Sequence, residues 1–211
     1  ATVGIMAGGA FGMTEAAPRK YPITYRAGSH EITLRQMTPG DKAGLLDFAR
    51  ALPEHDLLFL RRDISQEPAI DDWISELKSG EIVTILAVEG VRIVGYATIH
   101  RSLLRWTAHV AELRVMVAES ARGLGLGRVL TQEAFANALA MGIEKMVAQM
   151  TLDQKGAIAT FEGLGFRPEA LLRDQVKDRA GNTHDLLVLS HEVAKFESQR
   201  AAYGVSQAFG F

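Results

Sequence analysis

Three glycines at every second position join an apolar run to a long helical pattern. This stretch is the part of the sequence whose residue types and spacing most clearly indicate a binding site. The stretch reads Val115-Met116-Val117-Ala118-Glu119-Ser120-Ala121-Arg122-Gly123-Leu124-Gly125-Leu126-Gly127-Arg128. Apolar residues alternate up to Val117, as in a strand, and from Leu126 they follow helical spacing. Because glycine leaves the backbone unobstructed, consecutive N–H groups can face one hollow at the positive end of the new helix. The spacing therefore predicts an anion-binding loop.

The residues around the glycines narrow the choice of anion. A nucleoside-triphosphate loop needs a lysine after its last glycine, but here Gly127 is followed by Arg128, so the group that holds the terminal phosphates is missing. The dinucleotide pattern G-x-G-x-x-G also fails, whether it is counted from Gly123 or from Gly125. The pattern that remains, Arg122-x-x-Gly125-x-Gly127, resembles the pyrophosphate loop of the GNAT acetyltransferase superfamily.

The order of the expected elements agrees with this resemblance. We expect strands at residues 31–35, 82–87, 93–100, 109–117, 145–151, 170–178 and 183–193, and helices around 45–52, 71–77, 126–142 and 154–164. The segment Phe161-Glu162-Gly163-Leu164-Gly165-Phe166 looks like the family's Tyr-Glu-Lys-Leu-Gly-Phe segment. The resemblance spans roughly residues 32–193. It implies a mixed α/β (α+β) fold of the GNAT type, in which a twisted, mostly antiparallel central sheet of about seven strands carries helices on both faces.

The resemblance also implies an activity and a set of binding residues. Enzymes of this superfamily move an acetyl or other acyl group from coenzyme A to an amine, so acetyl-CoA is the expected co-substrate. The expected coenzyme A contacts are the amides of Arg122, Gly123, Leu124, Gly125, Leu126, Gly127 and Arg128 for the pyrophosphate, the backbone of Val115, Met116 and Val117 for the pantetheine arm, and Gln154 in place of a common family asparagine.

An amine acceptor must lose a proton before it can attack a thioester. A lysine-like amine with a pKa near 10.4 is almost entirely ammonium at neutral pH, so a base helps. Glu112 is our candidate, because it lies on the opposite strand face from Leu113 and because some lysine-modifying members of the superfamily place their base in this strand. The other interpretation is that Glu112 only pairs with Arg114 or another surface charge. In the ribosomal-protein N-terminal acetyltransferases the base lies on the following strand, where this chain has Gln149, which cannot take a proton.

Phe161 stands where many members of the superfamily have the tyrosine that protonates the leaving thiolate. Phe161 has no proton to give, and it falls on the apolar stripe with Ala157 and Leu164, so we expect it in the core. Tyr96 and His109 are alternative proton donors. Each of them can equally be a hydrogen-bonded core residue.

The composition excludes several other classes of protein. The chain has 211 residues, 23 Lys and Arg against 25 Asp and Glu, and no cysteine. This length suits one domain with a substantial core, and without cysteine there is no thiolate metal site and no cysteine to carry an acyl group. The balanced charge gives no sign of a nucleic-acid partner, the scattered histidines predict no metal site, and no apolar run is long enough to span a membrane. We expect a cytoplasmic protein.

Several expectations concern organisation and partners. We expect a flexible tail at residues 1–25, a single acetyltransferase domain at 26–196 and a second tail at 197–211. The charged connection at 54–67 is either a solvated loop or, through its acidic residues Glu54, Asp56 and Asp63, a region that attracts a cationic amine. The acceptor is the amine of a small molecule or of a protein or peptide, and the aromatic residues near the C-terminus are compatible with a homodimer. A non-catalytic acyl-coenzyme A sensor is the alternative function.

Overall fold

The computed structural model of the chain describes residues 19–57, 60, 62–178 and 180–193. One eight-stranded sheet forms its centre, in the order β1-β2-β3-β4-β5-β6-β8-β7. The strands are β1 (Ile23–Ala27), β2 (His30–Gln36), β3 (Ile82–Glu89), β4 (Arg92–Arg101), β5 (Val110–Val117), β6 (Lys145–Thr151), β7 (Arg167–Lys177) and β8 (Thr183–Glu192). All neighbouring strands run antiparallel except β5 and β6, which are parallel.

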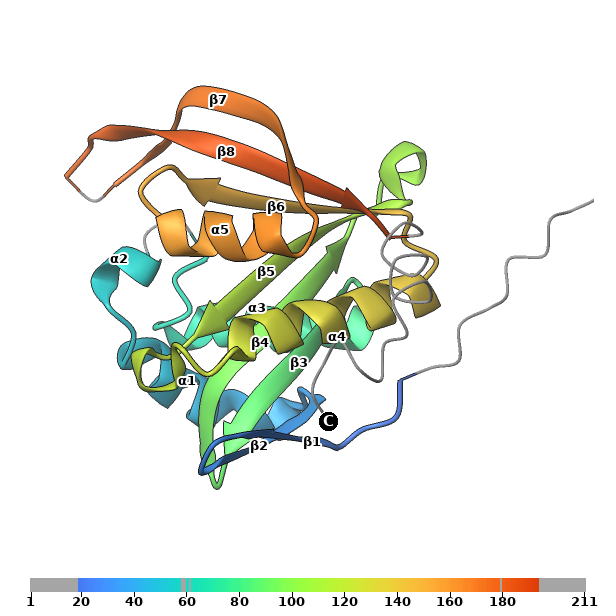
Figure 1. Cartoon of the computed structure of the whole chain (residues 1–211), viewed down its shortest axis with the longest axis vertical. Coiled ribbons are helices and arrows are strands. Elements are labelled where there is room, and N and C mark those ends of the chain that lie inside the picture. The colour runs from blue at the N-terminus through green and yellow to red at the C-terminus, as the bar shows by residue number, and fades with distance from the viewer. Residues whose placement is uncertain (1–18, 58–59, 61, 179, 194–211) are drawn as a thin grey trace, which may run out of the picture.

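Helices cover both faces of this sheet (Figure 1). The longer helices are α1 (Lys42–Arg50) and α3 (Glu67–Ser79) on one face, and α4 (Leu126–Ala140) and α5 (Lys155–Gly163) on the other. Shorter elements are α2 (Glu54–Leu57) and the 3-10 turns η1 (Pro39–Asp41), η2 (Arg105–Thr107) and η3 (Glu119–Ala121). Each face has its own cluster of buried apolar side chains. The predicted mixed fold, with a mostly antiparallel sheet between two layers of helices, is confirmed.

The sheet has one strand more than the seven or so that we expected. The additional strand is β1, which pairs with β2 along its whole length from Ile23 to Ala27. Residues 23–25 were assigned to the N-terminal tail, so the ordered fold begins earlier than predicted. A five-residue strand beside a glycine- and alanine-rich segment gives little periodic signal, whereas pairing with β2 supplies its hydrogen bonds in the folded protein.

Residues before β1 also contact the body of the protein. Glu133 lies on α4 and is only 5% exposed, and its Oε2 accepts hydrogen bonds from Arg19 Nε (2.9 Å) and from the Tyr21 hydroxyl (3.1 Å). The same hydroxyl accepts a hydrogen bond from Asn137 Nδ2 (2.7 Å). Burying a carboxylate costs free energy unless it is paired. Arg19 and Tyr21 supply the charge partner and the hydrogen bond that the buried Glu133 carboxylate needs.

The feature of the fold that creates a site is the short contact between β5 and β6. These strands pair only at Val110 to Glu112, against Lys145 to Val147. Beyond Glu112 they diverge, and β6 continues its pairing with β8 alone. The C-terminal half of β5 therefore has a neighbouring strand, β4, on one side only.

Two further observations concern expectations drawn from the sequence. Within the described part of the chain, no helix combines the length and the apolar character needed to cross a membrane. The C-terminal aromatic residues that we considered for a homodimer lie outside the described residues, as do most of the two predicted tails.

Candidate functional site

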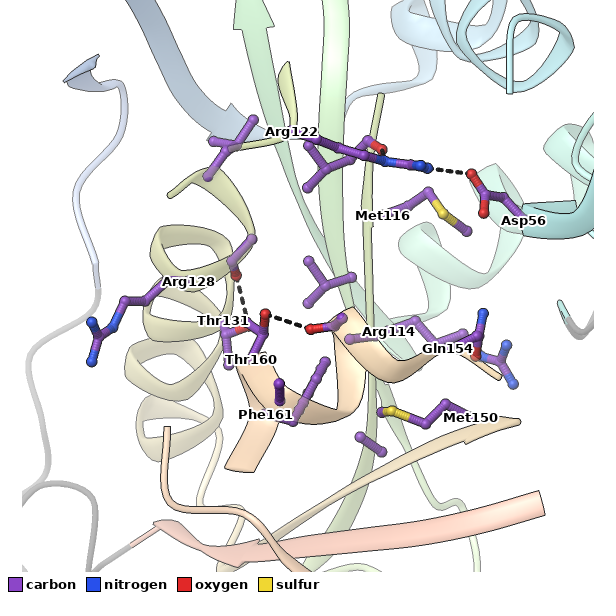
Figure 2. A pocket seen from close by; sticks show the side chains of 18 of the residues that line it. Asp56, Arg114, Met116, Arg122, Arg128, Thr131, Met150, Gln154, Thr160 and Phe161 are labelled. Atoms are coloured by element: carbon purple, nitrogen blue, oxygen red, sulfur yellow. Dashed lines mark hydrogen bonds and ion pairs between the residues drawn. The ribbon is translucent and has the colours of Figure 1, made fainter. Parts of the chain in front are cut away.

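The divergence of β5 and β6 opens a groove with a volume of about 900 Å³. Side chains from β5, the glycine loop, α4, β6 and α5 line it, and several of them are drawn in Figure 2. We call this space the cofactor groove. It contains nearly all of the residues that the sequence predicted to bind coenzyme A, although these residues come from elements far apart in the chain.

The glycine loop closes one end of the groove with its N–H groups. Gly123 and Gly125 have φ angles of 80° and 75°, the left-handed region in which glycine is strongly favoured. No described residue accepts a hydrogen bond from the N–H groups of residues 123–128, and the last three of these form the first turn of α4, where a helix has no internal acceptors. Arg122 differs from the prediction, because its N–H already donates to Glu119 O at 3.2 Å. The amide cradle therefore runs from residue 123 to residue 128.

The backbone of β5 presents alternate peptide groups to the groove. Ala118 N–H donates to Val94 O of β4 at 2.9 Å, and successive residues of a strand point their hydrogen-bonding groups to opposite sides. The peptide groups of Val115 and Val117 consequently face the groove. By the same alternation the peptide group of Met116 faces β4, although Met116 is among the residues that line the groove. The pairing of its backbone with the pantetheine arm therefore stays a prediction.

Arg122 makes an ion pair that the sequence did not predict. Its guanidinium bonds to Asp56 of α2, as Figure 2 shows. The neighbouring His55 contacts Asp153, in the loop after β6, at 3.0 Å (Nε2 to Oδ2). Helix α2 is therefore tied both to the glycine loop and to the loop before α5, the two ends of the opened strands. Asp56 was proposed as an attractor of amines, but its carboxylate is committed to Arg122.

Two other residues that we predicted to bind coenzyme A are Gln154, whose side chain already accepts a hydrogen bond, and Arg128, whose side chain is exposed. Gln154 lines the groove, and its Oε1 accepts a hydrogen bond from Thr151 N–H at 3.2 Å, so it also shapes the turn between β6 and α5. The side chain of Arg128 extends away from the other labelled residues in Figure 2 and is exposed. Its backbone is thus the part of Arg128 that belongs to the cradle.

Phe161 lies in the core, as its apolar stripe indicated. It is buried, and its ring contacts Phe166 edge to face, with ring centroids 4.9 Å apart. The alternative proton donors do not line the cofactor groove. Tyr96 packs between Trp73 and Phe48 on the other face of the sheet, where burial raises the pKa of its hydroxyl to about 12. His109 is exposed and directly precedes β5.

Glu112 opens onto a second groove, of about 540 Å³, which we call the acceptor groove. Gln149 lines both grooves, so they meet where β5 and β6 begin to diverge. The carboxylate of Glu112 is bonded to Arg114, with Oε1 at 2.9 Å from Nε and 2.7 Å from Nη2. The structure therefore contains the ion pair between Glu112 and Arg114 that we considered as the alternative to a catalytic role. It also places Glu112 beside the point where the two grooves meet. Arg114 lines the cofactor groove from the same strand.

No metal site was predicted, and the described residues include no group of three or more His, Asp or Glu side chains that could hold a metal ion. The polar groups that line the cofactor groove include peptide N–H groups, the amides of Gln149 and Gln154 and the guanidinium groups of Arg114 and Arg122, beside the carboxylates of Asp56 and Asp153. Such donors suit a phosphate anion and a thioester oxygen.

Comparisons with known proteins agree with this geometry. An acetyltransferase of the GNAT family from Streptococcus pneumoniae superposes with a TM-score of 0.68 at 20% identity, covering 77% of this chain and 99% of that one. A ribosomal-protein-alanine N-acetyltransferase from Brucella melitensis gives 0.67 at 23% identity, covering 75% and 98%. A putative acetyltransferase from Salmonella typhimurium, solved with its cofactor acetyl-CoA, gives 0.67 at 19% identity, covering 77% and 94%.

These solved structures share the fold at low sequence identity, and the search of curated proteins finds no match. The sequence itself carries the assignment, because the profile of the acetyltransferase (GNAT) family matches residues 48–166. That range runs from α1 to the end of the Phe161–Phe166 segment and includes both diverging strands and the glycine loop. This chain belongs to the acetyltransferase (GNAT) family, whose members use acetyl-CoA as co-substrate.

Proposed function

We propose that the protein is an N-acetyltransferase that moves the acetyl group of acetyl-CoA directly to a primary amine. One observation carries this proposal: the cradle of N–H groups at residues 123–128 and the outward peptide groups of Val115 and Val117 line a single groove. A diphosphate in the cradle would direct the pantetheine arm along β5. The thioester would then lie toward the junction with the acceptor groove, near Gln149.

The transfer itself requires few groups from the protein. The amine nitrogen attacks the thioester carbonyl carbon, a C–N bond forms, and the C–S bond breaks to release the coenzyme A thiolate. A peptide N–H of β5 would stabilise the oxyanion of the tetrahedral intermediate. Glu112, at the junction, would take the amine proton directly or through a water molecule. With Phe161 in the usual tyrosine position, the thiolate takes its proton from water or from the nitrogen of the tetrahedral intermediate, which loses its extra proton as the amide forms.

Release of free thiol tests the proposal. Purified protein is incubated with acetyl-CoA and a panel of amino acids, polyamines and peptides, and thiol formation and acetylated product are both measured. We expect amine-dependent thiol release and one acetylated amine for each thiol. In the matched variant Gly127→Glu, a side chain would enter the cradle, where nothing closer than Val117 Cγ2 at 3.9 Å obstructs it. This variant should lose both acetyl-CoA binding and activity.

Phe161 gives the alternative function a specific basis, because a protein that only senses acyl-coenzyme A has no need of a proton donor for the thiolate. Calorimetry with acetyl-CoA distinguishes the two functions. Tight binding that is lost in Gly127→Glu, together with no thiol release for any amine in the panel, would establish the sensor and exclude the transferase.

A further inference from the structure

The loop between β4 and β5 exposes large apolar side chains beside the acceptor groove. Leu103, Leu104 and Trp106 are 73%, 59% and 78% exposed, and we call them the apolar rim. Leu103 lines the acceptor groove, and so does Thr107, which follows Trp106 in the 3-10 turn η2. The rim is thus continuous with the groove, and Figure 1 shows this loop standing out beyond the end of the sheet. Large apolar side chains gathered on one exposed loop beside a groove point to an interaction site.

The charges within the groove argue against a polyamine as its occupant. Three carboxylates line it, those of Glu76, Glu81 and Glu112. Glu76 is bonded to Arg62 (Oε1 to Nη2, 2.5 Å) and Glu112 to Arg114. Within the described part of the chain, Glu81 makes no ion pair. A molecule with several ammonium groups would therefore find one carboxylate that is not already neutralised.

Besides the carboxylates, the lining contains guanidinium, imidazole, hydroxyl, amide and apolar groups. Arg62 and Arg101 line the same groove as Glu81, so it offers both donors and acceptors of hydrogen bonds. Mixed polar walls beside an apolar rim suit a peptide backbone that carries one amine and a large apolar side chain. A free polyamine would leave the apolar rim without a partner and would bring further positive charge next to Arg101.

We propose that the acceptor is a polypeptide, whose amine enters the acceptor groove while an apolar side chain one or two residues away packs on the rim formed by Leu103, Leu104 and Trp106. This inference rests on the proposed N-acetyltransferase function and specifies its substrate class. Glu81 attracts the ammonium form of the amine at the mouth of the groove, and the rim selects the neighbouring sequence.

Matched peptides test the proposal. The probes are Ac-Ala-Gly-Lys-Leu-Phe-Ala-amide and Ac-Ala-Gly-Lys-Ser-Ser-Ala-amide, a second pair with free N-termini and no lysine (Ala-Leu-Phe-Ala-amide and Ala-Ser-Ser-Ala-amide), and spermidine. The enzymes are the unmodified protein, Leu103→Ser/Trp106→Ser, and Val91→Ser, whose side chain is 95% exposed on the β3–β4 turn. Thiol release and product mass give kcat/KM for each combination, calorimetry gives the affinity for acetyl-CoA, and sedimentation gives the oligomeric state.

We expect the apolar member of one or both peptide pairs to exceed its serine counterpart by about tenfold in kcat/KM, and Leu103→Ser/Trp106→Ser to remove that preference. The serine peptides, the affinity for acetyl-CoA and the Val91→Ser control should change by less than about twofold. The lysine and N-terminal pairs tell which polypeptide amine reacts.

Three results would overturn the inference while leaving the transferase intact: spermidine as the best acceptor, equal rates for the apolar and serine peptides, or a rim variant that alters only self-association. Absence of thiol release for every acceptor would instead refute the transferase function itself, and the acceptor proposal with it. The two failures are therefore distinguishable.

Discussion

Two arginines at the site, Arg114 and Arg122, are each bonded to a carboxylate of this chain. Arg114 holds Glu112, the residue proposed to accept the amine proton, and Arg122 holds Asp56 beside the amide cradle. We identified both carboxylates, Glu112 and Asp56, as candidate functional residues in the sequence, but an ion-pair partner for only one of them. Arg114 is two positions from Glu112, and it was considered as a partner. Arg122 is 66 positions from Asp56, and nothing local connects them.

Replacement of Glu112 tests its role as a base. We expect Glu112→Gln to lower kcat/KM by about a hundredfold at neutral pH, because glutamine cannot take a proton. The loss should shrink as the pH rises, since an amine with a pKa near 10.4 then deprotonates without help. The measurement is a profile of kcat/KM against pH for both proteins. Parallel profiles would leave Glu112 with only its structural pairing to Arg114.

Asp56 should weaken the binding of coenzyme A, because its carboxylate and a diphosphate would compete for Arg122. We expect Asp56→Asn to lower the dissociation constant for coenzyme A by about twofold to fivefold, the range of a partly exposed ion pair, and the gain to diminish at high salt. Calorimetry at two salt concentrations measures it. Asp72→Asn, at an exposed position of α3, removes the same charge elsewhere. Weaker binding by Asp56→Asn would show instead that Asp56 holds Arg122 in its binding position.

At the scale of elements, the junction between β2 and α1 depends on a single carboxylate. Asp41 accepts hydrogen bonds from Arg35 Nη1 (Oδ2, 2.9 Å) and Arg35 Nη2 (Oδ1, 2.5 Å), and from Thr38 N–H (2.7 Å). The Arg35 hydrogen bonds lower the pKa of Asp41 to about 2, below its value of about 3.9 in an unfolded chain. Asp41 and Arg35 are six positions apart in the sequence, and the end of β2 brings the Arg35 side chain within reach of Asp41.

This pair should stabilise the fold in a pH-dependent way. Because folding lowers the pKa of Asp41, its contribution is complete above about pH 4 and is lost as the pH falls toward about 2. We expect Asp41→Asn to lower the free energy of unfolding by about 1–3 kcal/mol at neutral pH, and this difference to shrink over that acidic window. Urea unfolding across the window measures it, with Asp47→Asn, at an exposed position of α1, as the control. A difference independent of pH would contradict the assignment.

On the scale of the whole molecule, the N-terminal residues contact helix α4 and the glycine loop, which lie about a hundred positions further along the chain. Arg19 and Tyr21 neutralise and hydrogen-bond the buried Glu133 of α4. Tyr25 of β1 donates its hydroxyl hydrogen to Leu124 O at 2.6 Å, so the first strand supports the glycine loop directly. The amide cradle therefore depends on an N-terminal segment, part of which we predicted to be a flexible tail.

Shortening the chain tests this dependence. A chain that begins at residue 28 should be less stable than one that begins at residue 19 by at least about 3 kcal/mol, because it leaves Glu133 buried without its cation. It should also bind coenzyme A more weakly, since the Tyr25 contact is lost. Arg19→Ala in the full chain separates the effects, because it should lower stability and preserve affinity. Equal unfolding midpoints for the two shortened chains would restore the predicted boundary near residue 26.

The sequence by itself determined the features that depend on neighbouring residues. The change of period across Gly123 to Gly127 specified a strand, a turn with left-handed glycines and a helix, and hence the cradle of N–H groups. The apolar stripe through Phe161 specified its burial. The regular alternation of the strands and the helix signals between them specified the mixed fold.

Only the tertiary structure decided which distant groups meet. It recruited β1 to the edge of the sheet, joined Asp56 to Arg122 and Arg19 to Glu133, and faced the peptide group of Met116 toward β4. Periodicity describes forces along one element, such as local torsion preferences and the burial of one face. Ion pairs and strand edges depend on the distance between elements, and residues 66 or 114 positions apart acquire that distance only when the whole sheet has assembled.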